Sequence, residues 1–201
     1  QIVLMPTTNS AYGTGDKDHY CNEESPLRPI SQYAIEKVEI EKKLMQHPNA
    51  ISFRLATVFG MSPRMRIDLL VNDFTYRAVN DRSVVLFESH FKRNYIHVRD
   101  VSRVFQHAIN NHSTMKGEIY NVGLSDANVS KKELCEHIQK QLPEFVFIDE
   151  QIGKDPDQRN YIVSNEKIES TGFKTEFSLD RGIGELIKGY SMINNSRYGN
   201  V

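Results

Sequence analysis

Apolar residues gather in short runs along the chain, with longer stretches of mixed polar and apolar residues between them. Residues 2–5 are apolar without alternation, which is typical of a parallel strand buried on both faces. Further strands are predicted at 51–56, 84–87, 94–98, 118–122 and 146–148. Helices are predicted at about 31–47, 69–79, 101–111, 130–141, 164–171 and 179–193. Strands that alternate with helices favour a parallel sheet covered by helices on both faces.

Residues at the ends of the predicted helices support these boundaries. Ser31 can cap the first helix and Pro48 stops it, while Ser130 and Glu133 have the spacing of a capping box. On the first helix, the residues expected to face the sheet are Ala34, Val38 and Leu44. Those expected to stay in solvent are Glu39, Glu41, Lys42 and Lys43. Segment 6–30 is predicted to be a long active-site loop, and 155–159 a polar loop.

Composition narrows the class of protein without deciding it. The chain has 201 residues, of which 39% are hydrophobic, and a net charge of −1. This charge gives no reason to expect nucleic acid or an anionic membrane as a partner, and no apolar run is long enough to span a bilayer. Cys21 and Cys135 are expected to be free thiols of a cytoplasmic protein. The histidines show no metal-ligand spacing, so no metal site is predicted.

The strongest candidate for chemistry is the pair Tyr33 and Lys37. Residues four apart lie one turn from each other on the same face of a helix. An ammonium beside a phenol favours the phenolate, which makes a proton-transfer group for the oxidation of a sugar hydroxyl. Two common residues at this spacing carry little weight alone. The pair gains weight because Thr8 follows the first predicted strand and precedes Tyr12 and Gly13.

Together with the segments Arg54–Gly60, Arg93–Val101 and Tyr120–Gly123, these residues resemble the extended short-chain dehydrogenase/reductase family of NAD-dependent epimerases and dehydratases that act on nucleotide sugars. The resemblance covers nearly the whole chain. It implies that Thr8 is the catalytic hydroxyl, that Tyr33 is the acid/base, and that Lys37 supports Tyr33 and binds the nicotinamide ribose. It implies that the cofactor, NAD with NADP not excluded, is bound by Thr7, Tyr33, Lys37 and Ala56.

The same resemblance implies a set of substrate-binding residues: Asn9, Ser10, Thr57, Asn72, Leu86, Phe87, Arg93 and Arg159. Planar guanidinium groups suit a diphosphate, so the two arginines are expected to hold that link; their alternative is an exposed salt bridge. Residues 85–87 match the segment that borders the nucleobase in the family, but such an apolar triplet can equally be core. His97 is expected to be a structural histidine, and Arg54 is either near the cofactor or a packing residue between helix and sheet.

Two local features bear on the reaction and the substrate. Family members that dehydrate hexoses resemble one another in having Asp-Glu directly after the catalytic Thr, where this chain has Asn9 and Ser10. Dehydration is therefore disfavoured. The remaining reactions begin with oxidation at C4 of the sugar, and the enzyme is then an epimerase or a dehydrogenase. Segment 62–74 resembles the GDP-heptose-modifying branch of the family, which favours a GDP-sugar; its alternative is an amphipathic helix with a basic lead-in.

The glycine-rich turn with which the family opens its NAD-binding half has no counterpart in the sequence. We therefore expect an α/β fold that is the C-terminal part of a Rossmann-type parallel sheet with helices, plus a small α/β substrate-binding domain. Residues 1–60 and 92–123 are assigned to the former, and 61–91 and 124–201 to the latter. A catalytically inactive, nucleotide-sugar-binding fragment is the alternative. The resemblance also implies a homo-oligomer.

Overall fold

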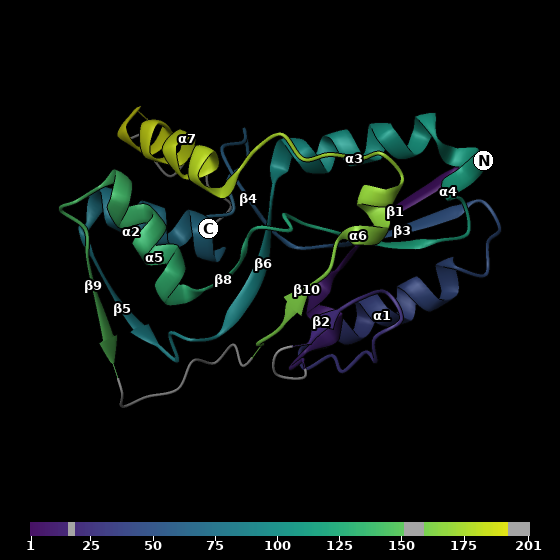
Figure 1. Cartoon of the computed structure of the whole chain (residues 1–201), viewed down its shortest axis with the longest axis horizontal. Coiled ribbons are helices and arrows are strands. Elements are labelled where there is room, and N and C mark those ends of the chain that lie inside the picture. The colour runs from purple at the N-terminus through teal and green to yellow at the C-terminus, as the bar shows by residue number, and fades with distance from the viewer. Residues whose placement is uncertain (16–18, 151–158, 193–201) are drawn as a thin grey trace.

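The computed structural model describes residues 1–15, 19–150 and 159–192. Its centre is a parallel sheet with the strand order β1-β3-β7, in which Thr8 is paired in register with Leu55. The strands are β1 (Val3–Thr8), β3 (Ala50–Leu55) and β7 (Ile119–Val122). In Figure 1, α1 (Gln32–Leu44) lies below this sheet and α3 (Val98–Asn110) above it. The predicted parallel α/β arrangement is confirmed.

A second lobe, at the left of Figure 1, is built around three helices: α2 (Leu70–Asn80), α5 (Lys131–Gln141) and α7 (Leu179–Met192). The parallel pair β5 (Ser83–Phe87) and β9 (Val146–Glu150) lies along its edge. Between the lobes run β4 (Thr57–Phe59), β6 (Lys92–His97) and β8 (Asn128–Ser130). Because β6 is parallel to β4 and antiparallel to β8, this middle sheet is mixed.

Several small elements were not predicted. Segment 6–30 is not a plain loop, because β1 continues to Thr8 and the 3₁₀ helix η1 (Asn9–Tyr12) follows it. The two-residue strand β2 (Tyr20–Cys21) pairs with β10 (Ile162–Val163) from the far end of the chain. The helix predicted at 164–171 is confirmed as the short helix α6 (Glu166–Ser170), whereas the short helix α4 (His112–Met115) was not predicted. Elements this short depend on tertiary contacts and leave no period in the sequence.

The two predicted helix caps are confirmed, whereas α1 ends at Leu44 and not near residue 47, and α3 begins at Val98 and not at residue 101. The Ser31 hydroxyl accepts a hydrogen bond from the Ala34 N–H, and Ser130 with Glu133 forms a complete capping box. The predicted end of the last helix, residue 193, and residues 155–158 of the predicted polar loop lie outside the described residues. No helix in the described ranges is long and apolar enough to cross a membrane.

The prediction that Glu41 stays in solvent is wrong. This side chain is buried against the central sheet, where Arg54 of β3 pairs with it at 2.6 Å between Nη2 and Oε1. The prediction of a solvent-exposed Glu41 rests on its charge alone. Its position on α1, one turn after Lys37, directs the side chain towards β3. Arg54 is therefore a packing residue between helix and sheet. Cys21 and Cys135 are free thiols, as predicted.

Apolar side chains form two main cores. One lies between α2, α5 and α7 and includes Val71, Leu86 and Leu134. The other lies on the central sheet under α3 and includes Phe53 and Val104. The cavity described next opens where elements of both cores meet.

Candidate active site

A cavity of about 740 Å³ lies beyond the carboxyl ends of β1 and β3. Thr8, Tyr33 and Lys37 all line it, together with residues of the β4–α2 segment and of β6. In parallel sheets, loops at the carboxyl ends of the strands converge and form the usual ligand crevice. The structure therefore brings together the three residues that the sequence singled out for catalysis.

Thr8 is the last residue of β1 and the N-cap of η1. Its Oγ1 accepts a hydrogen bond of 3.1 Å from the Ser10 N–H, and the side chain is buried. A hydroxyl has one donor and two acceptor positions, so this bond leaves the Thr8 proton available for an oxygen in the cavity.

Tyr33 and Lys37 lie one turn apart on α1, as predicted. The Lys37 Nζ is 5.9 Å from the centre of the Tyr33 ring and donates a hydrogen bond of 3.1 Å to the Pro6 carbonyl of β1. One of its three N–H groups is thus used, and two remain for a ligand. Tyr33 is 53% exposed and lines the cavity, so a ligand in the cavity can contact this side chain.

The cavity is strongly cationic, although the chain as a whole carries a net charge of −1. Against the single carboxylate of Asp68, its lining contains Lys37, Arg64, Arg66, Arg93, Lys131 and Arg159. Asp68 accepts two hydrogen bonds from Arg66, of 2.8 Å and 2.5 Å, and these lower the pKa of the carboxyl. The remaining positive charge favours an anionic ligand.

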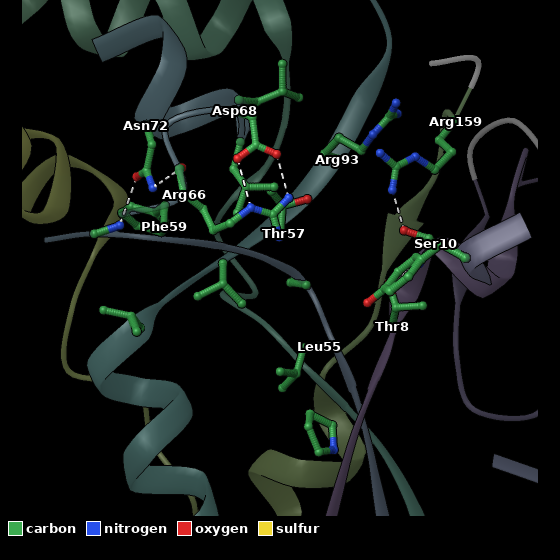
Figure 2. Close-up of a pocket in the computed structure, with 18 of the residues that line it drawn as sticks. Thr8, Ser10, Leu55, Thr57, Phe59, Arg66, Asp68, Asn72, Arg93 and Arg159 are labelled. Carbon is green, nitrogen blue, oxygen red and sulfur yellow. Dashed lines mark hydrogen bonds and ion pairs between the residues drawn. The ribbon is translucent and has the colours of Figure 1, made fainter. Parts of the chain in front are cut away.

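Arg93 and Arg159 enter this cavity from different parts of the chain (Figure 2). Arg93 of β6 is buried; its Nη1 donates to the Lys92 carbonyl at 3.0 Å, and its guanidinium lies 5.7 Å from the Tyr161 ring centre. The Arg159 Nη1 donates to the Ser10 hydroxyl. Both guanidinium groups are thereby oriented before any ligand arrives.

The other predicted site residues divide into two groups. Thr7, Ser10, Ala56, Thr57 and Asn72 line the cavity. The Asn72 amide accepts from the Gly60 N–H at 3.1 Å and donates to the Arg66 carbonyl at 2.9 Å, so it fastens the segment that carries Arg66 (Figure 2). Three predicted residues do not line the cavity: Asn9, Leu86 and Phe87. Leu86 is part of a core, and Asn9 is fully buried.

Four charged residues of the cavity lining were not predicted individually: Arg64, Arg66, Asp68 and Lys131. The first three belong to segment 62–74, whose resemblance to the GDP-heptose-modifying branch and basic lead-in are a signal for them. Lys131 gave no signal, because its position at the start of α5 was explained by the capping box. It is almost fully buried, and its Nζ donates to the Phe87 carbonyl at 2.8 Å.

His97 has a structural role, as expected. It is fully buried, its Nδ1 accepts from the Arg99 N–H at 3.2 Å, and its ring stacks on Phe177. Burial lowers its pKa. Gly60 lies against this ring with φ +113, and a Cβ there would be 2.4 Å from the His97 Nε2, so only glycine fits.

This fold and site define a Rossmann-type α/β protein with a Tyr–Lys pair and a cationic ligand cavity. The sequence pattern of the NAD dependent epimerase/dehydratase family matches residues 2–123, and the chain belongs to that family. This confirms the coarse resemblance that the sequence suggested.

Known proteins support the fold. The chain is 24% identical over 199 residues to the dTDP-D-glucose 4,6-dehydratase of Mus musculus, which covers 93% of the chain and 55% of that protein. The dTDP-glucose 4,6-dehydratase of Bacillus anthracis, solved in complex with NAD, superimposes with a TM-score of 0.79 at 20% identity, over 98% of this chain and 63% of that one. The UDP-glucose 4-epimerase of Thermotoga maritima, solved with UDP-glucose, superimposes with a TM-score of 0.80 at 22% identity, over 94% of this chain and 63% of that one.

Proposed function

We propose that this chain provides the catalytic residues of an NAD-dependent enzyme that acts at C4 of a nucleotide-diphosphate sugar. The observation that carries the proposal is the convergence of Thr8, Tyr33 and Lys37 in the same cationic cavity as Arg93 and Arg159. A Tyr–Lys pair fits proton transfer at a sugar hydroxyl, and oriented guanidinium groups fit a diphosphate.

In this proposal Arg93 and Arg159 bind the diphosphate and thereby place the sugar in front of Thr8 and Tyr33. The Thr8 hydroxyl donates a hydrogen bond to the C4 oxygen and holds that oxygen in position, while keeping its own proton. Tyr33 accepts the hydroxyl proton during oxidation and returns it during reduction. Lys37 stabilises the phenolate that Tyr33 must present.

The residues present fit the nicotinamide end of NAD. Thr7, Tyr33, Lys37 and Ala56 line one cavity, and Lys37 keeps two N–H groups that can donate to the ribose hydroxyls. When bound, NAD supplies the acceptor and donor of hydride. NADP remains an alternative cofactor.

For the substrate we propose a GDP-sugar, on the resemblance of segment 62–74 to the GDP-heptose-modifying branch. Arg64, Arg66 and Asn72 of this segment line the cavity, which supports a role in substrate binding. We propose no dehydration, because Asn9 and Ser10 cannot supply an acid and a base, although two of the related proteins are dehydratases. Product analysis separates the remaining options: an epimerase leaves no net NADH, whereas a dehydrogenase accumulates it.

A second candidate function is a nucleotide-sugar-binding unit without activity of its own. The chain spans about 55–63% of the length of the relatives described above. The observation that favours this candidate is the cationic lining of the cavity, which suits a diphosphate whether or not hydride transfer follows. An NADH fluorescence titration, with and without GDP-mannose, separates the two. Tight NADH binding supports the enzyme, whereas GDP-mannose binding without NADH binding supports the binding unit.

We also propose a homo-oligomer that uses α1. Ile35 and Ile40 on this helix are 37% and 41% exposed, which supports a contact there. The division into a nucleotide-binding part, 1–60 with 92–123, and a substrate part, 61–91 with 124–201, is supported by most members of the two cores. The exceptions are Phe59 and Tyr95 in the core of the substrate part, and Ile168 and Phe173 in the core on the central sheet. Light scattering tests the oligomer: a monodisperse monomer contradicts it.

A further inference from the structure

The buried ion pair between Glu41 and Arg54 lies outside the cavity, yet it contacts the elements that carry every proposed catalytic residue. Glu41 and Arg54 are both only 4% exposed. A buried carboxylate costs several kcal/mol unless it is paired and hydrogen-bonded. Here the Glu41 carboxylate accepts from Arg54, from the Ser52 Oγ at 2.7 Å and from the Thr7 Oγ1 at 3.0 Å.

The Thr7 bond ties α1 to β1 directly beside the catalytic position. Thr7 immediately precedes Thr8, while Glu41 lies one turn after Lys37 and two turns after Tyr33 on α1. A second tie between the same elements is the Lys37 hydrogen bond to the Pro6 carbonyl. The spacing between strand and helix is thus set at two adjacent residues of β1, Pro6 and Thr7, that lead directly to Thr8.

Arg54 extends the network to the other side of Thr8. Its Nη1 donates to the Tyr12 hydroxyl at 3.1 Å, and that hydroxyl donates to the Asn121 Oδ1 of β7 at 2.7 Å. Tyr12 closes η1, the turn that Thr8 caps. Burial raises the pKa of Tyr12 to about 12, so its hydroxyl remains a donor at neutral pH. Thr8 therefore lies between two residues, Thr7 and Tyr12, that both hydrogen-bond to the Glu41–Arg54 ion pair.

We infer that the Glu41–Arg54 pair is a positioning pair that fixes the distance of Thr8 from Tyr33 and Lys37. The inference rests on the proposed function for its meaning in catalysis. Its geometric content, that Glu41 holds α1 against β1, stands without any substrate. Neither residue touches the reacting atoms, and both act through Thr7, Tyr12 and the backbone of α1.

The test is mass-spectrometric labelling of lysines in the folded chain, with Glu41→Gln as the variant. Glu41→Gln keeps the shape of the side chain but removes the charge that holds Arg54. If α1 shifts from β1, the Lys37 bond to Pro6 breaks, and acylation of Lys37 relative to Lys42 and Lys43 rises about five-fold. Glu39→Gln is the matched control, because it makes the same change on the exposed face of the same helix and should leave the ratio unchanged.

An unchanged Lys37 ratio in a folded Glu41→Gln protein overturns the inference and leaves the pair a purely structural one. If that variant does not fold, Thr7→Val decides, since it removes the tie between Glu41 and β1, together with the Thr7 bond to the Ser52 Oγ of β3, and keeps the Glu41–Arg54 ion pair. A raised Lys37 ratio in Thr7→Val supports positioning, and an unchanged ratio rejects it. Because no nucleotide sugar is used, failure of the proposed function would appear separately, as absent GDP-mannose binding by the unaltered chain.

Discussion

Replacement of Arg159 by Gln tests the diphosphate site most sharply. Arg159 lines the cavity and donates to the Ser10 hydroxyl, so its guanidinium is already oriented in the free protein. A charge-assisted hydrogen bond is worth about 1.5–3 kcal/mol, and the lower end applies to this half-buried group. For two bonds to a diphosphate the loss is about 3 kcal/mol, which weakens the Kd by about 100-fold.

Isothermal titration calorimetry with GDP-mannose measures this loss. Guanosine, which has no diphosphate, should bind the variant and the unaltered chain equally. Arg77→Gln is the matched control, because Arg77 is exposed, pairs only locally with Asp73 at 2.8 Å and does not line the cavity. A Kd for Arg159→Gln within about two-fold of the unaltered chain, or an equal loss for guanosine, would refute the assignment.

Three further predictions concern the proton-transfer residue and two ionisable groups. Tyr33→Phe should lower turnover of the active enzyme by about 10²–10⁴-fold at unchanged nucleotide-sugar affinity, and a full-rate variant would remove Tyr33 from the mechanism. Arg66 lowers the pKa of Asp68 below its ordinary 3.8, so their ion pair stabilises the fold above that pH. This stabilisation, about 1 kcal/mol or less, is lost as the pH falls through the lowered pKa. Urea unfolding across this pH range should show the loss in the unaltered chain and not in Asp68→Asn. Burial raises the pKa of Cys135 to about 12, so iodoacetamide should label it only after unfolding, as mass spectrometry can check.

The long elements and the catalytic face of α1 could be predicted from the sequence. Apolar runs and caps set the strands and helices, and a spacing of four residues was enough to put Tyr33 and Lys37 on one face. The capping residues Ser31 and Ser130 gave helix starts to within a residue or two. These are local signals, and they need no knowledge of the partner segments.

The rest depends on contacts between distant segments. β2 and β10 pair only because residues about 140 apart in sequence meet. Glu41 looked like a solvent residue, since nothing near it in sequence shows that Arg54 lies opposite on β3. Lys131 was not predicted to line the cavity, because the capping box at the start of α5 already accounted for this stretch of sequence. The sequence could name which residues carry charge, but not which charges the fold would bury together.

The central claim is that one cavity holds the diphosphate of a nucleotide sugar and presents its C4 hydroxyl to Thr8 and Tyr33. A crystal structure of the chain with GDP-mannose tests this most directly. The account predicts phosphate oxygens within hydrogen-bond distance of Arg93 and Arg159, and the C4 oxygen within that distance of the Thr8 and Tyr33 hydroxyls. A nucleotide sugar bound elsewhere, or bound here with its sugar turned away from Thr8, would contradict it.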